Sequence, residues 1–183
     1  MATTYFGNSD FPATFGFITV VEVSTLGHCG GLLVVSSIGR PIEFHFTAPV
    51  SQNRAQEIMY GKTYPGFLYG DRIGAALVDK AKKMPTLFVT DCSEMLPISE
   101  LIDPPLVIVP SNNRANKTEA FDGSGLKFFE LNGERIYCLN TPPEMLEQVE
   151  HHITKFVKQL PFDEPFERIH QAIFEANQVL RAS

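Results

Sequence analysis

The sequence predicts an α/β fold built on a mixed β-sheet, and three observations in its N-terminal half lead to that prediction. Three apolar runs rich in β-branched residues come first, at residues 16–24, 30–37 and 41–50. A segment with helical spacing of its apolar residues follows at about 51–83, and a fourth apolar run follows at 86–91. This order predicts an antiparallel meander of three strands that is joined to a fourth strand by a right-handed helical crossover.

The strands differ in their expected burial. The first two runs are almost continuously apolar, which is typical of central strands covered on both faces. The third run alternates strictly between apolar and polar residues, which predicts a half-exposed strand. Its two faces carry Ile42, Phe44 and Phe46 on one side, and Glu43, His45 and Thr47 on the other.

Two helices are predicted within the crossover. Ser51 can cap a helix that runs to about Tyr60. A second helix is predicted over Leu68–Lys83, because apolar residues recur at helical spacing and lysines gather near its C-terminal end. Pro85 then stops this helix before the fourth strand.

The C-terminal half extends this core. Residues 106–109 form a short apolar run between prolines and predict a further strand, whereas residues 111–125 are polar and predict a mobile loop. Asn132-Gly133 lies between two β-type runs, and this pair is the strongest short-range signal for a hairpin. Two helices end the chain, the first capped by Thr141 and the second at about residues 163–181.

Composition predicts a single globular domain over residues 1–183, with a core at 16–110, a loop at 111–125 and a hairpin and helical extension at 126–183. Hydrophobic residues make up 44% of the chain, and the net charge is −6. This acidic balance disfavours nonspecific binding to nucleic acid. The three cysteines do not form a disulfide framework, and no signal peptide or membrane-length apolar stretch occurs, so we expect a cytoplasmic protein without membrane contact.

Glu22 and Asp91 are the acids that the strand order singles out. If the first and fourth strands are neighbours, these two carboxylates could meet near one end of the sheet. Converging carboxylates bind Mg²⁺ or Mn²⁺, because these hard ions prefer oxygen ligands, and such a site can activate water for attack on a phosphodiester. The alternative is that both acids have only local structural roles.

The strand order is similar to that of the ribonuclease-H-like fold, and two segments resemble endonuclease V. Residues 64–72, YPGFLYGDR, resemble that family's Tyr/Pro-Gly-Leu-Leu-x-Phe-Arg-Glu segment, and residues 87–91 resemble its strand that carries a metal-binding aspartate. The resemblance covers about residues 16–91. It implies a nuclease dependent on Mg²⁺ or Mn²⁺. Its ligands would be Glu22 and Asp91, with Asp71 or Glu43 as a possible third.

The sequence departs from this family at several positions. The first acid is a glutamate rather than an aspartate, and Arg72 stands where the family has glutamate, with Asp71 one place away. Cys92 follows Asp91 where the family has glycine. These differences affect the positions that would hold the metal, so the resemblance predicts the fold more directly than the activity.

Other polar and aromatic groups suggest further sites. Cys29, Cys92 and His45 are residue types that suit Zn²⁺, although their spacing brings no two of them together locally. An aromatic and basic cluster could stack bases or hold a partner peptide. This cluster consists of Tyr60, Tyr64, Phe67 and Tyr69 with Arg54, Lys62 and Arg72.

Two functional hypotheses follow from the sequence. The leading one is a non-catalytic binding or assembly module, because no complete catalytic set of residues is evident and the two C-terminal helices carry wide apolar stripes that could cover a protein partner or a second copy. The alternative is a divalent-metal-dependent phosphodiesterase or nuclease that resembles endonuclease V. The first hypothesis expects Glu22 and Asp91 to lie apart, and the second expects them to converge beside a basic rim.

Overall fold

The computed structural model describes residues 13–110 and 126–182. The predicted loop at 111–125 lies outside these residues. The strands are β1 (Thr14–Val23), β2 (Gly27–Ser36), β3 (Pro41–Phe46), β4 (Leu87–Thr90), β5 (Leu106–Ile108), β6 (Lys127–Leu131) and β7 (Glu134–Leu139). The helices are α1 (Arg54–Tyr60), α2 (Tyr64–Gly66), α3 (Ala75–Lys80), α4 (Pro143–Val157) and α5 (Asp163–Ala182), with a π-helical segment at Phe67–Gly74 and a 3₁₀ segment at Ser93–Glu100.

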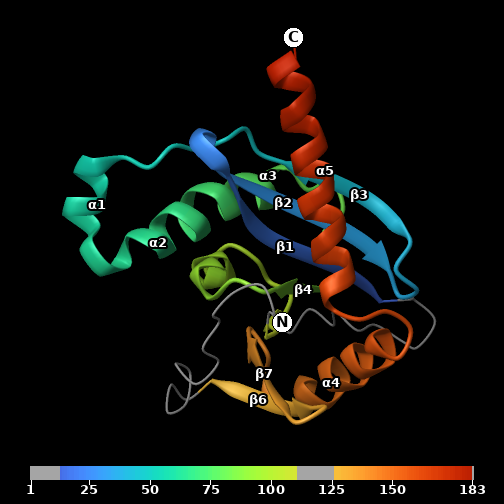
Figure 1. The fold of residues 1–183 in the computed structure, drawn as a ribbon. Coiled ribbons are helices and arrows are strands. Elements are labelled where there is room, and N and C mark those ends of the chain that lie inside the picture. The colour runs from blue at the N-terminus through green and yellow to red at the C-terminus, as the bar shows by residue number, and fades with distance from the viewer. Residues whose placement is uncertain (1–12, 111–125, 183) are drawn as a thin grey trace.

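The strands within the described residues form one seven-stranded mixed sheet in the order β3-β2-β1-β4-β5-β7-β6 (Figure 1). β1, β2 and β3 are antiparallel neighbours, and β4 pairs with β1 in the parallel direction, which confirms the predicted meander and crossover. The hairpin of β6 and β7 extends the sheet beyond β5. The fold is therefore α/β with the strand order of the ribonuclease-H-like class.

Helices cover both faces of this sheet. The long helix α5 crosses one face over β1 and β2, and α4 lies on the same side (Figure 1). The side chains between these helices and the sheet form one apolar core, which includes Phe17, Phe156 and Ile169. The opposite face is covered by the π-helical segment, α3 and the 3₁₀ segment, which enclose a second core around Leu32 and Leu77. This burial on both faces explains the continuous apolar character of β1 and β2.

Local sequence signals agree with the structure at one turn and differ from it at the start of two helices. Asn132 and Gly133 have φ of 55° and 83°, as a tight hairpin turn requires, so the predicted hairpin is confirmed. Helix α1 begins after Asn53, not Ser51, because the Asn53 side chain accepts a hydrogen bond from the Gln56 amide. No residue of α1 is buried, so this short helix projects from the body of the sheet (Figure 1). The N-cap position of α4 is Pro142, and the Thr141 hydroxyl donates to the Leu139 carbonyl instead of capping the helix.

No helix in the part of the chain that the structure describes is both long and apolar enough to cross a membrane.

Candidate functional site

Asp91 lies at the end of β4, where it is almost completely buried at 3% exposure. The hydroxyl of Thr19 on the neighbouring strand β1 donates a hydrogen bond of 2.6 Å to Asp91 Oδ1. This contact follows from the parallel register of β1 and β4. Ile18 lies opposite Thr90, so the next residues along the two strands, Thr19 and Asp91, also lie side by side. A threonine, and not a second carboxylate, is therefore the β1 neighbour of Asp91.

Glu22 is on the same strand but faces the other way. It lies three residues beyond Thr19, which corresponds to about 10 Å along a strand and reverses the side-chain direction. Its cross-strand partner is His28 on β2, and its side chain is exposed. The two acids therefore belong to opposite faces of the sheet, and the convergence on which the metal hypothesis depends does not occur between Glu22 and Asp91.

Of the other two predicted ligands, Glu43 is apart from Asp91, and Asp71 lines a cleft with Ser93 and Glu94. Glu43 is on β3, which β2 and β1 separate from β4, so roughly 14 Å lie between these strands at ordinary spacing. Asp71 is exposed on the π-helical segment and lines a surface cleft. Among the described residues, no group of three His, Cys, Asp or Glu side chains is placed to hold a metal ion.

The residues suggested for zinc also separate. Cys29 belongs to the core beneath α4 and α5, whereas Cys92 belongs to the core on the opposite face of the sheet. His45 on β3 contacts Glu43. The sheet itself keeps these side chains apart, so the structure does not assemble the suggested zinc site. Burial also raises the pKa of the Cys29 thiol, which disfavours the thiolate that a metal or a nucleophile requires.

A cleft of about 480 Å³ lies beside the end of β4, between the α1–α2 segment and the 3₁₀ segment. Tyr60 and Phe67 both line it, and their rings are stacked with centroids 4.0 Å apart and an interplanar angle of 15°. The full lining is Tyr60, Lys62, Thr63, Pro65, Gly66, Phe67, Asp71, Ser93, Glu94, Leu96 and Pro97. The cleft thus combines an aromatic platform, one lysine and two carboxylates.

Glycines in the π-helical segment let the two walls of this cleft pack closely behind it. A Cβ on Gly70 would lie 2.6 Å from Pro97 Cδ, and a Cβ on Gly74 would lie 2.5 Å from Ile98 Cγ2. Both distances are shorter than side-chain packing allows. Glycine has a low helix propensity, so Gly70 and Gly74 disfavour a helix locally. In return, they permit the close contact with Pro97 and Ile98, which a larger residue would prevent.

The predicted aromatic and basic cluster is only partly in the cleft. Tyr60 and Lys62 line it, whereas Tyr64 is buried and its hydroxyl accepts a hydrogen bond from the Asn53 amide. Tyr69 contacts His28 through its hydroxyl. Arg54 pairs with Glu57 on α1, and Arg72 is exposed and does not line the cleft.

The second wall of the cleft was not predicted from the sequence. Ser93 and Glu94 follow Asp91 almost directly, and the Glu94 carboxylate accepts a hydrogen bond of 3.0 Å from the Ser93 hydroxyl. Their position just after a parallel strand is the signal that could have identified them, since loops at the carboxyl ends of such strands often form binding sites.

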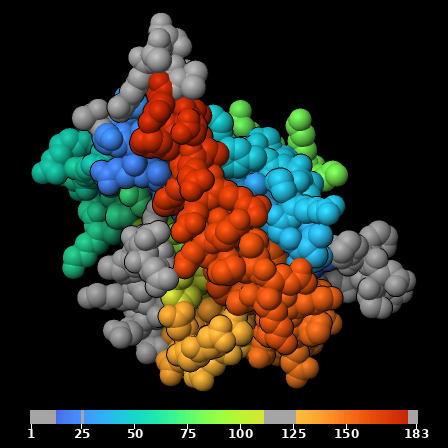
Figure 2. Space-filling model, turned by 45° about the vertical axis from the view of Figure 1, so that its right-hand side comes forward, coloured from blue at the N-terminus to red at the C-terminus, as the bar shows by residue number. Residues whose placement is uncertain are grey.

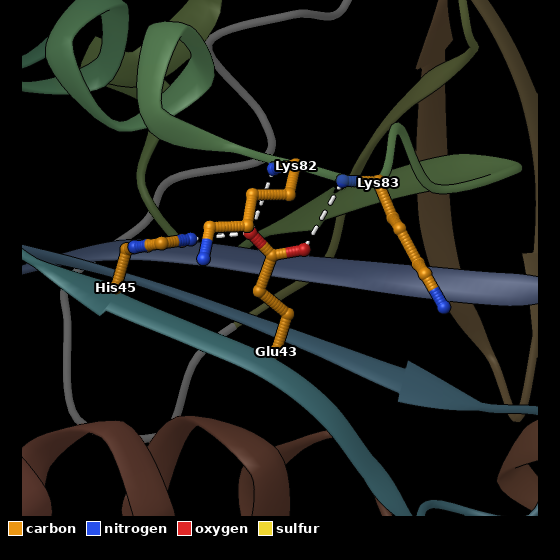
Figure 3. A network of polar contacts seen from close by, with 4 residues as sticks. All are labelled: Glu43, His45, Lys82 and Lys83. Carbon is orange, nitrogen blue, oxygen red and sulfur yellow. Dashed lines mark hydrogen bonds and ion pairs between the residues drawn. The ribbon is translucent and has the colours of Figure 1, made fainter.

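Glu43 has a structural role at the edge of the sheet (Figure 3). Its carboxylate accepts hydrogen bonds from the backbone amides of Lys82 and Lys83, at 2.7 and 3.1 Å, and it also contacts His45. These contacts connect β3 to the chain that follows α3. The Lys82 amide, followed by the hydrogen bond with His45, lowers the pKa of Glu43 below its ordinary value.

Glu43→Gln is therefore expected to lower the melting temperature by an amount that depends on pH. A lowered carboxyl pKa stabilises the folded state above the pKa of the unfolded chain, about 4.3, and this contribution is lost as the pH falls through the lower, folded-state pKa. The difference between wild type and variant should be largest near neutral pH and should shrink below about pH 4. Thermal unfolding from pH 7 to pH 3 measures it, with Glu134→Gln at an exposed hairpin position as the control. A constant difference across this range would contradict the assigned role.

No protein-family model and no curated protein matches the chain. Solved structures with the same fold do exist. The structure of human endonuclease V aligns with a TM-score of 0.54 and 13% identity, covering 94% of this chain and 87% of that chain. The catalytic domain of human endonuclease V aligns with a TM-score of 0.51 and 12% identity, covering 92% and 85%. At this level of identity the likeness establishes the fold alone.

Proposed function

We propose that the protein is a non-catalytic nucleic-acid-binding module that holds an unpaired base in the cleft beside β4. The observation that carries this proposal is the stacked pair of Tyr60 and Phe67 in the lining of an open cleft. Exposed aromatic rings bind bases by stacking, because every base has a π-face, and single-strand binders rely on this contact. The exposed, projecting helix α1 supplies Tyr60 and can approach a nucleic-acid strand without rearrangement of the core.

The polar groups of the cleft favour bases that carry an exocyclic amino group. Asp71 and Glu94 are hydrogen-bond acceptors. The amino groups of cytosine, adenine and guanine donate to carboxylates, whereas thymine offers only its N3–H, which lies between two carbonyl oxygens that repel a carboxylate. Lys62 is the lysine in the lining and can pair with one phosphate. Because the cleft lining contains one lysine and the chain has a net charge of −6, the affinity for nucleic acid should depend weakly on salt concentration.

The residues present do not fit the divalent-metal site that the endonuclease V fold would imply. Thr19 is the neighbour of Asp91 on β1, and Glu22 faces the opposite side of the sheet. Arg72 stands at the position where the resemblance expects a glutamate, and a guanidinium group repels a cation. Among the described residues, no group of three His, Cys, Asp or Glu side chains is placed to bind Mg²⁺ or Mn²⁺.

Metal-dependent cleavage of nucleic acid remains the second candidate function, because the overall fold is that of two endonuclease V structures. That likeness favours a role on nucleic acid over a protein-assembly role. Asp91 supports this candidate because it lies directly after β4, the strand next to β1. Cleavage would then require further ligands that approach only together with the substrate.

Fluorescence anisotropy of labelled single-stranded 12-mers tests the proposal. We expect oligo-dC and oligo-dA to bind more tightly than oligo-dT. Tyr60→Ala should weaken binding by roughly 1–3 kcal/mol, the usual contribution of one stacked base. The control is Phe128→Ala on β6, because Phe128 and Tyr60 are both 42% exposed and Phe128 is outside the cleft. Equal affinity of wild type and Tyr60→Ala, or no binding, would refute the proposal.

The same oligonucleotides separate the two candidate functions when their lengths are measured after incubation with millimolar Mn²⁺. Intact oligonucleotides that still bind would agree with a non-catalytic module. Cleavage by the wild type that is lost in Asp91→Asn would instead establish the nuclease. Thermal unfolding of Asp91→Asn provides the control for folding, because the Thr19 hydroxyl loses its charged acceptor in this variant.

A further inference from the structure

β3 is the outermost strand on one side of the sheet, and within residues 13–110 and 126–182 no strand pairs with its outer edge. Figure 2 shows this segment at the molecular surface beside α5. Ile42 and Phe46 are about 40% exposed, at 41% and 42%. The edge of a sheet presents unpaired amide and carbonyl groups, which are a template for another strand.

The backbone groups that point outward can be derived from the pairing with β2. The Thr47 amide donates to the Gly30 carbonyl, and residues that face a neighbouring strand alternate along an antiparallel pair. Glu43 and His45 therefore direct their backbone groups toward β2, and Phe44 and Phe46 direct theirs outward. The register shift opposite Val34 and Val35 affects only the start of β3, so the Phe44–Phe46 end remains regular.

The sequence of β3 is chemically symmetric about Phe44. On each side of Phe44, the adjacent residue has an ionisable side chain and the next residue is large and apolar. These are Glu43 and Ile42 on one side, and His45 and Phe46 on the other. If two copies of β3 pair antiparallel about Phe44, each Glu43 lies opposite the His45 of the other copy. Each Ile42 then lies opposite the other copy's Phe46. Apolar side chains in directly opposed positions stabilise antiparallel strands. Glu43 keeps its contacts with His45 and with the Lys82 and Lys83 amides of its own copy, and the other copy's His45 comes to lie beside this acceptor.

We propose that β3 is the contact surface for a second copy of this chain, joined by antiparallel pairing about Phe44 into one continuous sheet across a two-fold axis. A pairing about Glu43 would oppose two glutamates, and a pairing about His45 would oppose two histidines. The register at Phe44 avoids both of these like pairs and places Ile42 against Phe46. This inference does not depend on the proposed nucleic-acid binding.

The opposite edge of the sheet lacks this symmetry. β6 has Phe129 at its centre, and antiparallel self-pairing there would oppose Phe128 with Glu130 and Lys127 with Leu131. The Arg135 guanidinium also covers the Phe128 ring at 4.9 Å from its centroid. Phe128 and Phe46 are both 42% exposed, so β6 offers a matched control surface with the wrong chemistry for self-pairing.

Sedimentation velocity over a range of concentrations of the full chain tests the contact. We expect a reversible monomer–dimer equilibrium. Phe46→Lys should raise its dissociation constant by about tenfold or more, because a lysine on an edge strand opposes pairing. Phe128→Lys should leave the equilibrium unchanged. A monomer at all concentrations would overturn the proposal, as would a dimer that is weakened by Phe128→Lys and not by Phe46→Lys.

Disulfide cross-linking tests the register. Directly opposed residues have Cα atoms about 5.5 Å apart, within reach of a disulfide. An oxidised mixture of Ile42→Cys and Phe46→Cys should therefore form a covalent heterodimer. Each variant alone should not, because its cysteines are several residues apart across the axis. The native Cys29, Cys92 and Cys138 are buried and should not react. Cross-linking within either variant alone, or none in the mixture, would refute the register.

Discussion

Gly31→Ala is expected to destabilise the folded protein by roughly 2–3 kcal/mol, although alanine is the better residue for an ordinary strand. Gly31 is on β2, beneath α5, and a Cβ there would lie 2.2 Å from Ile169 Cγ2 and 3.1 Å from Ile173 Cδ1. Both isoleucines are fully buried, so they have no free volume into which to move. The added methyl group must displace α5 from the sheet.

The adjacent Gly30 serves the opposite face. A Cβ on Gly30 would lie 2.2 Å from Ile73 Cγ2, at the end of the π-helical segment. Gly30 and Gly31 therefore allow helical segments on both faces of the sheet to contact β2. Through these contacts β2 takes part in both apolar cores.

Urea denaturation of wild type, Gly31→Ala, Ile169→Ala and the double variant measures this close contact. Because Ile169→Ala removes the methyl group that the new Cβ would meet, the double variant should lose less stability than the sum of the two single variants. Gly66→Ala is the control, since its Cβ would lie 3.8 Å from Pro97 Cγ, an ordinary contact, and should be neutral or slightly stabilising. Strict additivity would contradict the predicted overlap.

Phe17→Ala is expected to cost about 3–5 kcal/mol, the range for removing a fully buried phenylalanine. Phe17 lies on β1 at 0% exposure, and its ring contacts those of Phe156 on α4 and Phe166 on α5, with centroids 5.4 and 5.3 Å apart. Its loss leaves a cavity at the point where both C-terminal helices meet the sheet.

Thermal unfolding should show a fall in Tm of roughly 10 °C for Phe17→Ala in a chain of this size. Phe174→Ala, at a position on α5 that is 59% exposed, should change stability by less than about 0.5 kcal/mol. Similar losses in both variants would mean that α5 does not pack on the sheet through the face that contains Phe166.

Both experiments also address the sequence-based suggestion that the C-terminal helices cover a partner. Val149, Ile153 and Phe156 on α4 and Phe166, Ile169 and Ile173 on α5 belong to the protein's own core. Their apolar stripes cover the sheet of the same chain, so they do not supply evidence for an external partner. The exposed apolar residues of β3 are the stronger basis for self-association.

Features that depend on nearby residues could be predicted from the sequence. The alternation of apolar and polar residues at 42–47 predicted the half-exposed strand β3, and Asn132-Gly133 predicted the hairpin of β6 and β7. The order of strands and helices gave the meander and crossover, because connections between neighbouring elements obey strong rules of handedness and length. Of the predicted aromatic and basic cluster, Tyr60 and Lys62 line the cleft, whereas Tyr64, Tyr69 and Arg72 do not.

The site itself depended on long-range register, which the sequence does not show directly. Glu22 and Asp91 are on strands of the same sheet, but a shift of three residues along β1 places Thr19 beside Asp91 and turns Glu22 to the other face. The second wall of the cleft depended on how the 3₁₀ segment packs against glycines in the π-helical segment. The sequence by itself determined the strands, their order and the burial of β1 and β2 on both faces, since these follow from local periodicity and turn chemistry. Only the tertiary structure decided which polar side chains meet, because that depends on strand register and helix packing between residues far apart in the chain.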